Sequence, residues 1–186
     1  MLYVGIDPGN EGFIAVLDAE GRHKATHEMP VIEGEKKVLP DVPAIKRILS
    51  DLAGEDDITV FVESQTARPA IFTNSEGNLQ RGQGSASIFS TGRWQGVLEG
   101  VLSGTYPVEF QTPGTWQKVM HEGATGNDTK AKSIQVAGRL FPLVDLRKNT
   151  RCRKPHDGKA DALLMAEWLR RKHLGLLPGK QGRPRR

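Results

Sequence analysis

The chain is poor in cysteine and in long apolar runs, and each shortage excludes a class of protein. The single cysteine among 186 residues, Cys152, cannot form an internal disulfide or a cysteine-based zinc site, and it fits a reducing cytoplasm. No apolar run approaches the roughly 18 residues of a membrane span. The start, MLYVGIDPG, lacks a basic region followed by an apolar stretch. We therefore expect a soluble cytoplasmic protein with no secretion signal and no membrane partner.

The length and the distribution of charge predict one domain that binds a polyanion. A chain of 186 residues suits one compact domain, expected over residues 1–175, followed by a basic tail at 176–186. Residues 1–63 hold 13 acids and 6 bases, a net charge of −7, and the remainder holds 9 acids and 20 bases, or +11. This asymmetry favours a positive surface beside a locally negative site, although a solvated surface with a basic tail would give the same counts.

The apolar pattern of the first third predicts a mixed α/β sheet. Two short apolar runs flank the turn-forming PGNEG and predict a β-hairpin, and ITVFVE reads as a strand buried on both faces. In chain order we expect strands near residues 4–6, 13–17 and 23–29, a helix that begins after Pro40 and Asp41, and a strand at 58–63.

The rest of the chain reads as one long loop followed by helices and a strand. Residues 65–90 are rich in Gly, Ser, Asn, Gln and Thr, and so predict a loop of functional length. A helix at 91–105 places Gly92, Gly96 and Gly100 on one face, which suggests close backbone packing there. Further elements are expected as a strand at 108–111, a short helix from Pro113, a helix at 130–141, and a last helix whose first residue is Pro155.

Four carboxylates stand at the ends of these elements. Asp7 ends the first strand, Glu63 ends the buried strand, and Asp157 and Asp161 lie in the first turns of the last helix. If the two strands are neighbours, their carboxyl ends and the start of the helix meet at one place. Each acid has an ordinary alternative as a turn residue, a surface charge or a helix start. Together they predict a metal site.

The chemistry of these ligands points to magnesium. Clustered carboxylates repel one another, and Mg²⁺ is commonly held by a few carboxylates together with substrate phosphate. The five histidines show no paired ligand spacing. Two ions about 3.5 to 4 Å apart would activate a water and stabilise the leaving oxygen of a phosphodiester displacement.

Six motifs resemble the RuvC-like Holliday junction resolvases, especially a branch of phages and bacteria that is similar to the chloroplast resolvases of plants. The matching stretches span residues 3–169 and are VGIDPGNEGFIAVL, VFVESQTARP, FSTGRWQGVLEGVL, FQTPGTWQKV, RLFP and KPHDGKADALLMAEWL. The resemblance implies an RNase H-like fold, a homodimer, two Mg²⁺ ions for which Mn²⁺ can substitute, and no small-molecule cofactor. It also implies paired symmetric nicks in a four-way DNA junction that leave ligatable 5′-phosphate ends, in a bacterial or phage-infected cell or in an organelle.

By position, the resemblance assigns three catalytic acids and leaves the fourth open. Asp7, Glu63 and Asp161 match family ligands, but the position three residues before Asp161 is Gly158. Asp157 or His156 must then substitute. In a helix Asp157 lies about 40° from Asp161 and His156 about 140° away, which favours Asp157. His156 is alternatively a residue that supports the ligands, a phosphate contact or an exposed helix cap.

The resemblance also implies which residues contact DNA. The segment 65–90 corresponds to the junction-binding segment of the family, and a surface loop is the alternative reading. Trp116 either stacks on a base or lies in the core, and tail bases strengthen binding through counterion release. The expected DNA contacts are Arg68, Arg81 and Phe89, followed by the phosphate-binding candidates Lys118, Lys130, Lys132, Arg151, Arg153 and Lys154.

Three other functions fit parts of the sequence. A nuclease of the same fold that cuts the RNA strand of an RNA–DNA hybrid would use the same acids. A junction-binding module without catalysis would need no intact acid set. The D-P-G motif near the start also occurs in the phosphate loop of actin-like ATPases, but these need two lobes, for which 186 residues leave little room.

Overall fold

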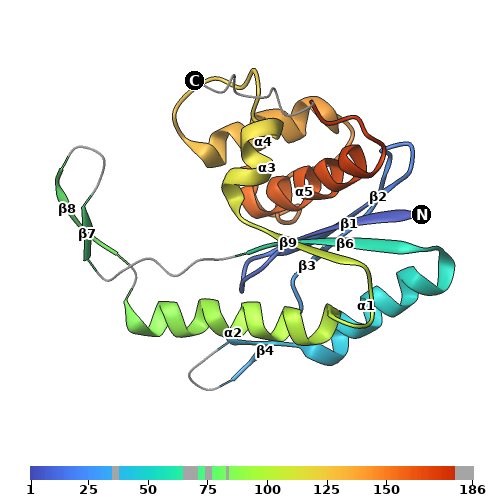
Figure 1. Ribbon diagram of the computed structural model, residues 1–186, viewed down its shortest axis with the longest axis horizontal. Coiled ribbons are helices and arrows are strands. Elements are labelled where there is room, and N and C mark those ends of the chain that lie inside the picture. Colours follow the sequence, from blue (N-terminus) through green and yellow to red (C-terminus); the bar gives the residue numbers. More distant parts are fainter. Residues whose placement is uncertain (35–37, 65–70, 74–76, 83, 179–186) are drawn as a thin grey trace, which may run out of the picture.

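The computed structural model describes all residues except 35–37, 65–70, 74–76, 83 and 179–186, and a five-stranded sheet lies at its centre. The strands of this sheet are β1 (Leu2–Asp7), β2 (Phe13–Asp18), β3 (His23–Glu28), β6 (Ile58–Glu63) and β9 (Val108–Gln111). Their order is β3-β2-β1-β6-β9 (Figure 1), in which β1 is antiparallel to β2 and parallel to β6, and β6 is parallel to β9. The predicted hairpin, third strand and buried strand are confirmed.

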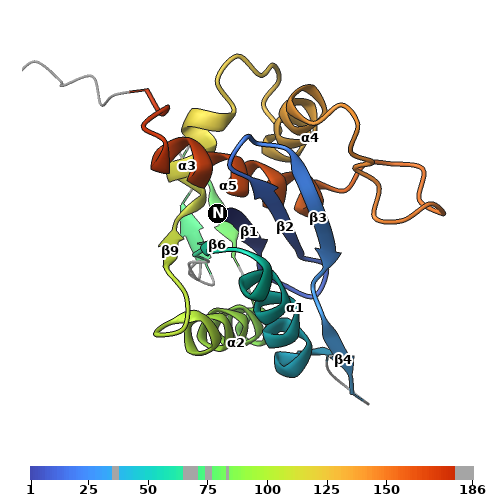
Figure 2. The ribbon, with the colours of Figure 1, turned by 90° about the vertical axis from the view of Figure 1, so that its right-hand side faces the viewer.

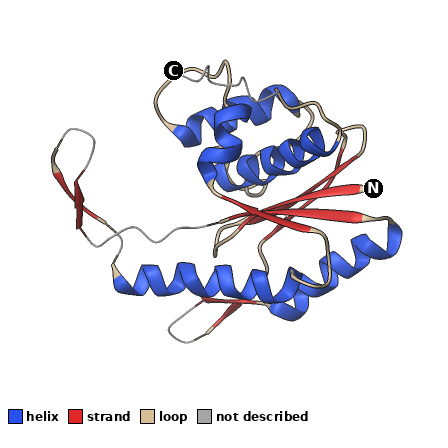
Figure 3. Ribbon diagram, in the orientation of Figure 1, coloured by secondary structure: helices blue, strands red, loops and turns tan. Residues whose placement is uncertain are grey.

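Helices cover both faces of the sheet (Figures 1 and 3). The helices α1 (Val42–Glu55) and α2 (Ser85–Leu102) lie on one face, and α3 (Pro113–Met120), α4 (Thr129–Leu140) and α5 (Asp157–His173) lie on the other. Each face buries its own hydrophobic cluster. The predicted α/β class with a mixed central sheet is therefore confirmed. Within the residues that the structure describes, no helix combines the length and the apolar character that crossing a membrane requires.

The central strands alternate their side chains between the two clusters. In β1, Tyr3 belongs to the cluster under α5, whereas Val4 and Ile6 belong to the cluster under α1 and α2. In β6, Phe61 faces α5 and Val60 faces the opposite side. Because successive strand residues point to opposite faces, a strand covered on both faces must be apolar throughout, which explains the ITVFVE run.

Helix α5 lies directly on β1 and β2, and Gly5 is the residue that permits this approach (Figure 2). A Cβ atom on Gly5 would lie 2.1 Å from the carbonyl oxygen of Ala162 and 2.6 Å from the backbone nitrogen of Ala166. A side chain would therefore force the helix off the strand. This contact determines how near the start of α5 comes to the end of β1.

The segment predicted as one loop at 65–90 was assigned wrongly in part. It contains two short antiparallel strands, β7 (Ile71–Thr73) and β8 (Leu79–Arg81), which project beyond the start of α2 (Figure 1). Helix α2 begins at Ser85 and not at residue 91. The apolar side chains of Ile71 and Leu79 are 66% and 76% exposed, so neither supplies the buried position by which sequence analysis recognises a strand.

Two further predictions need correction. The last helix begins at Asp157 with His156 as its N-cap, and Pro155, predicted as the first helical residue, instead forms an extended bridge with Arg147. The glycine face of α2 has no packing partner in the described part of this chain. A Cβ atom on Gly92, Gly96 or Gly100 would meet no described atom within 4 Å apart from the backbone of α2 itself. The predicted close packing is therefore absent from the described part of this chain, and packing against a second chain stays a prediction. A further small hairpin, β4 (Val31–Glu33) with β5 (Val38–Pro40), precedes α1.

Candidate active site

Three carboxylates approach one another at the carboxyl edge of the sheet. Asp7 and Glu63 are the last residues of the neighbouring parallel strands β1 and β6, in which Ile6 lies opposite Val62. Helix α5, packed on β1, brings Asp161 from its second turn, and the charge of Asp161 acts on both Asp7 and Glu63. The sheet register and the position of α5 therefore place these acids close enough to interact.

Burial and mutual repulsion raise the pKa values of all three acids. Burial is the largest cause for Asp7, whose pKa is raised well above its usual value, and Asp161, Glu63 and Asp157 add to the rise. Burial, followed by the charge of Asp161, raises the pKa of Glu63 to about 7. Burial also raises the pKa of Asp161 to about 6, although a hydrogen bond with Ser133 opposes the rise. Such a group favours either protons or a bound cation.

Asp157 differs because a lysine neutralises it. Although burial raises its pKa, the hydrogen bond and charge of Lys130, together with a backbone hydrogen bond and the charge of His156, lower the pKa below the ordinary value. Lys130 Nζ lies 2.6 Å from Asp157 Oδ2, and the ion pair in turn raises the pKa of Lys130. The charge of Lys130 also lowers the pKa values of Asp7 and Asp161. One ammonium group therefore compensates part of the negative charge of the site.

Gly158 lets the Asp7 carboxylate lie against α5. A Cβ atom on Gly158 would be 2.5 Å from Asp7 Oδ2 and 3.4 Å from His156 Cε1. An aspartate at this position, where the resemblance leads one to expect an acid, would therefore require Asp7 to move. The absence of a side chain at Gly158 therefore permits the present position of the Asp7 carboxylate.

His156 is the N-cap residue of α5, as one alternative predicted, but it is half-buried beside this glycine and not exposed. Its ring lies 5.0 Å from the ring of Phe13, its Nδ1 is buried with no hydrogen-bond partner among the described residues, and its side chain makes no capping hydrogen bond. Its backbone is extended, with φ −104° and ψ 123°. The angular argument against His156 assumed a helical residue and does not apply. The choice between Asp157 and His156 remains open on geometry.

The donor chemistry of the site fits a hard divalent cation. All three central donors are carboxylates, and Asp161 Oδ1 is buried without a hydrogen-bond partner in the described part of the chain. Their side chains do not stand in ligating positions, since the described residues contain no group of three or more His, Cys, Asp or Glu placed to hold a metal ion.

The residues predicted to contact DNA fall into several groups. Arg68 lies outside the described residues, and Arg81 ends β8, but its side chain is not described. Phe89 is 63% exposed on α2 and carries the guanidinium of Arg93 over its ring at 5.0 Å. Of the rest, Lys130 reaches the carboxylates, Lys132 is half-buried, and four are exposed around the same face of the sheet: Lys118, Arg151, Arg153 and Lys154.

Trp116, for which the sequence left two readings open, is fully buried, which supports the core reading and excludes stacking on a base in this conformation. Several other residues were not found from sequence. Lys148 Nζ lies 3.9 Å from carboxylate oxygens of both Glu11 and Glu28. Ser133 and His121 stand behind Asp161. These side chains are distant in the sequence and meet only because the helices pack on the sheet, so no local motif identifies them.

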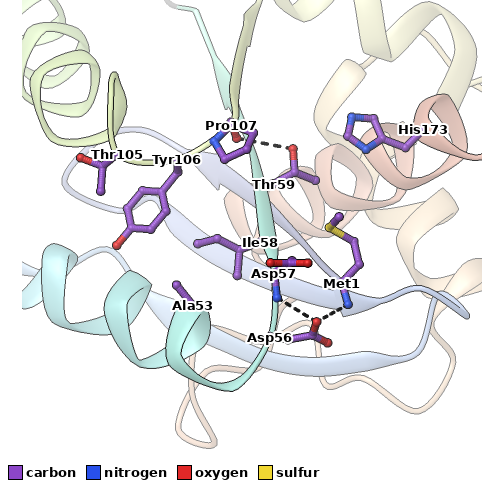
Figure 4. Close-up of a pocket in the computed structure, with 10 residues that line it drawn as sticks. All are labelled: Met1, Ala53, Asp56, Asp57, Ile58, Thr59, Thr105, Tyr106, Pro107 and His173. Atoms are coloured by element: carbon purple, nitrogen blue, oxygen red, sulfur yellow. Dashed lines mark hydrogen bonds and ion pairs between the residues drawn. The ribbon is translucent and has the colours of Figure 1, made fainter.

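A separate cavity of about 350 Å³ lies at the opposite edge of the sheet (Figure 4). It is lined by residues before and at the start of β6, including Asp56 and Ile58, together with Met1 and His173. The amino group of Met1 pairs with Asp56, and the hydroxyl of Thr59 donates to a backbone carbonyl at 3.4 Å. Glu63 is at the other end of this strand, so the cavity is separate from the carboxylate group.

Comparisons with known proteins identify the fold. No protein-family description and no curated protein matches the sequence. Among solved structures, the chain is similar to T. thermophilus RuvC in complex with Holliday junction substrate, with a TM-score of 0.55 and 17% sequence identity. The similarity covers 95% of this chain and 98% of that chain. The chain therefore has the RNase H-like α/β fold of RuvC, as the sequence predicted.

Proposed function

We propose that this protein is an endonuclease that cuts four-way DNA junctions with the help of divalent metal ions. The observation that carries the proposal is the approach of Asp7, Glu63 and Asp161 at one edge of the sheet, with pKa values raised by burial and mutual repulsion. The fold similarity to a RuvC structure that contains a Holliday junction supports the choice of substrate. The motifs that resemble the resolvases also support this choice of substrate. On the same motifs we place the protein with the branch of phages and bacteria that is similar to the chloroplast resolvases.

In this proposal the carboxylates hold two Mg²⁺ ions, for which Mn²⁺ can substitute. Asp7, Glu63 and Asp161 are the ligands, and Asp157 or His156 completes the site. When bound, such ions supply an activated water and charge neutralisation at the leaving oxygen. A bound cation would relieve the mutual repulsion among the carboxylates, and this relief favours metal binding.

The basic residues near the site would bind the phosphates. Lys130 pairs with Asp157 at the site. If Asp157 bound a metal ion instead, the ammonium group of Lys130 would be free to bind a neighbouring phosphate. The DNA arms would be contacted by the exposed residues Lys118, Arg151, Arg153, Lys154 and Phe89, and by the half-buried Lys132. Arg68 and Arg81 are proposed as DNA contacts on the resemblance of the sequence alone. Phosphate contacts supply most of the nonspecific affinity and position the duplex without reading its sequence.

Paired symmetric nicks require two active sites, so we propose a homodimer. The exposed glycine face of α2, formed by Gly92, Gly96 and Gly100, would accept the close approach of a second copy. Gly96→Leu should then weaken dimerisation while leaving the monomer fold intact, because its Cβ meets open space in this chain. Sedimentation at micromolar concentration checks this. An unaffected dimer would place the interface elsewhere.

The decisive experiment uses a labelled fixed four-way junction, a duplex of the same sequence and a matched RNA–DNA hybrid. Each is incubated with Mg²⁺ or with chelator, and the cut sites are mapped. We expect metal-dependent, symmetric nicks in the junction only. Preference for the hybrid would instead indicate an RNA-cutting enzyme. Tight junction binding without metal-dependent cleavage would indicate a binding module.

A further inference from the structure

Behind Asp161, a short chain of polar side chains links three helices. Ser133 on α4 is 1% exposed, and its hydroxyl lies near enough to the Asp161 carboxylate on α5 to lower the pKa of that acid. The Nε2 atom of His121, the residue that follows α3, lies 2.9 Å from the Ser133 hydroxyl oxygen. A buried hydroxyl is costly to leave without hydrogen-bond partners. His121 supplies one partner, and the Asp161 carboxylate is on the other side.

The backbone and the aromatic packing hold His121 in place. Its N–H donates to the carbonyl of Gln117 at 2.8 Å, and its own carbonyl accepts from the N–H of Ala124 at 3.0 Å. The imidazole ring stands edge-on to the buried ring of Trp116, with 5.7 Å between the centroids. The histidine is therefore a fixed point from which the serine hydroxyl can be oriented.

The single proton of the Ser133 hydroxyl determines which group donates and which accepts in this series of hydrogen bonds. A serine has one proton to donate, and an ionised carboxylate only accepts. The Ser133 hydroxyl must therefore donate to Asp161 and accept from the Nε2–H of His121. Burial, and then the charge of Lys132, lowers the pKa of His121, so the ring is neutral at pH 7 and carries its proton on Nε2. No second cation is introduced beside the carboxylate.

We infer that Ser133 and His121 are positioning residues, which orient the Asp161 carboxylate so that its unpartnered Oδ1 atom is available to a metal ion. The inference deepens the proposed function and rests on it. Hydrogen bonds to ligating groups commonly fix ligand orientation, and their loss typically costs about 10–100-fold in metal affinity. A lysine in place of Ser133 would neutralise Asp161 and compete with the metal. A serine supported by a neutral histidine orients the acid without competing.

The test measures metal binding by the whole protein without DNA, by Mn²⁺ titration. Ser133→Ala should weaken binding about tenfold, and Ser133→Thr, which keeps the hydroxyl, should restore most of it. His121→Phe keeps a ring against Trp116 but removes the donor, so it should weaken binding by a smaller factor. His121→Gln keeps a donor and should bind nearly as the unaltered protein does. Nitrogen NMR of His121 should show the proton on Nε2, with its signal shifted in Ser133→Ala.

Matched controls separate positioning from general stability. Ser50, whose hydroxyl bonds within α1, and His173, whose ring stands edge-on to Tyr3 at 5.6 Å, allow Ser50→Ala and His173→Phe as equivalent changes away from the site. Neither control should alter Mn²⁺ affinity. Unchanged affinity in Ser133→Ala and His121→Phe would overturn this inference and leave the proposed function standing. Absence of any Mn²⁺ binding by the unaltered protein would overturn both.

Discussion

Strand β6 has acidic residues at both ends, and the two ends differ in their electrostatics. At the carboxyl end, Glu63 is half-buried near Asp161, and this partial burial, followed by the charge of Asp161, raises its pKa to about 7. Before the amino end, Asp56 is exposed and accepts hydrogen bonds from the amino group of Met1 and from the backbone of Asp57, so its pKa is lowered. Burial and partners, more than the number of carboxylates, therefore decide which acidic group is poised for a cation.

The cover over each end explains this difference. At the carboxyl end, α5 lies against Gly5 and Asp7, and Asp7, Glu63 and Asp161 are each only partly exposed to solvent. At the amino end, a cavity remains open and the acidic groups meet water and hydrogen-bond donors (Figure 4). The following predictions test this contrast, beginning with the largest expected effect.

Junction cleavage should depend on the acid at the carboxyl end of β6 and not on the acid before its amino end. Glu63→Gln should reduce junction cleavage more than about 100-fold, because loss of a ligand should exceed the effect of losing a group that merely orients one. Asp56→Asn should leave the rate unchanged. Single-turnover cleavage of a fixed junction, with binding measured separately, checks both. Comparable losses in the two variants would show that the ends do not differ in function.

The fourth ligand is tested by a pair of neighbouring variants. Asp157→Asn removes a negative oxygen from a hard cation and should reduce nicking about 10–100-fold while junction binding survives. His156→Ala should reduce the nicking rate by a smaller factor, because a neutral imidazole is a poor ligand for Mg²⁺. The reverse order would assign the ligand to His156, whose buried Nδ1 has no partner in the described structure, and would leave Asp157 as the partner of Lys130.

The cover over the carboxyl end is tested at two glycines. Gly5→Ala should lower the free energy of unfolding by about 1–3 kcal/mol, since overpacking forces backbone shifts and its Cβ would lie 2.1 Å from a carbonyl oxygen of α5. Gly54→Ala, on α1 near the other edge, meets no described atom within 4 Å and should be neutral or slightly stabilising. Urea denaturation measures both. Equal effects would mean that α5 can shift freely over β1.

The stability of the metal-free protein should fall as pH rises from about 4 to about 7. The folded-state pKa values of Glu63 and Asp161, about 7 and about 6, exceed the ordinary values of 4.5 and 3.8, so the folded state binds more protons within this window. Under linkage, the free energy of unfolding then decreases with rising pH. Denaturation in chelator at pH 5 and pH 7.5 should show the decrease, reduced in Glu63→Gln. Parallel profiles for the two proteins would contradict the assigned repulsion.

Much of the fold could be predicted from sequence because the core strands and helices carry a periodic apolar signal. The run 58–63 had to be a buried strand, and Asp41 was placed correctly as the start of α1, where its side chain caps the Ala44 N–H. The elements that were missed lack this signal. Ile71 of β7 and Leu79 of β8 are exposed, and the first turn of α2 buries no residue, so no buried apolar position marks the start of these elements.

The candidate site was predictable only where its residues end a regular element. Asp7 and Glu63 were found because each closes an apolar strand, and Asp161 because it precedes the apolar face of a helix. Lys130 was identified as a phosphate contact, but its ion pair with Asp157 was not foreseen. A salt bridge between residues on different helices depends on the packing of those helices, which no local pattern records.

The sequence by itself determined the class of fold, the strands that carry two of the acids and the chemistry of the donors, because periodicity and residue type act locally. The tertiary structure decided how far α5 approaches β1, which depends on the absent side chains of Gly5 and Gly158. It also decided that Asp157 pairs with Lys130, and that His121 and Ser133 stand behind Asp161. These relations join residues distant in the chain, and their energies arise from burial and proximity that exist only after the helices have packed on the sheet.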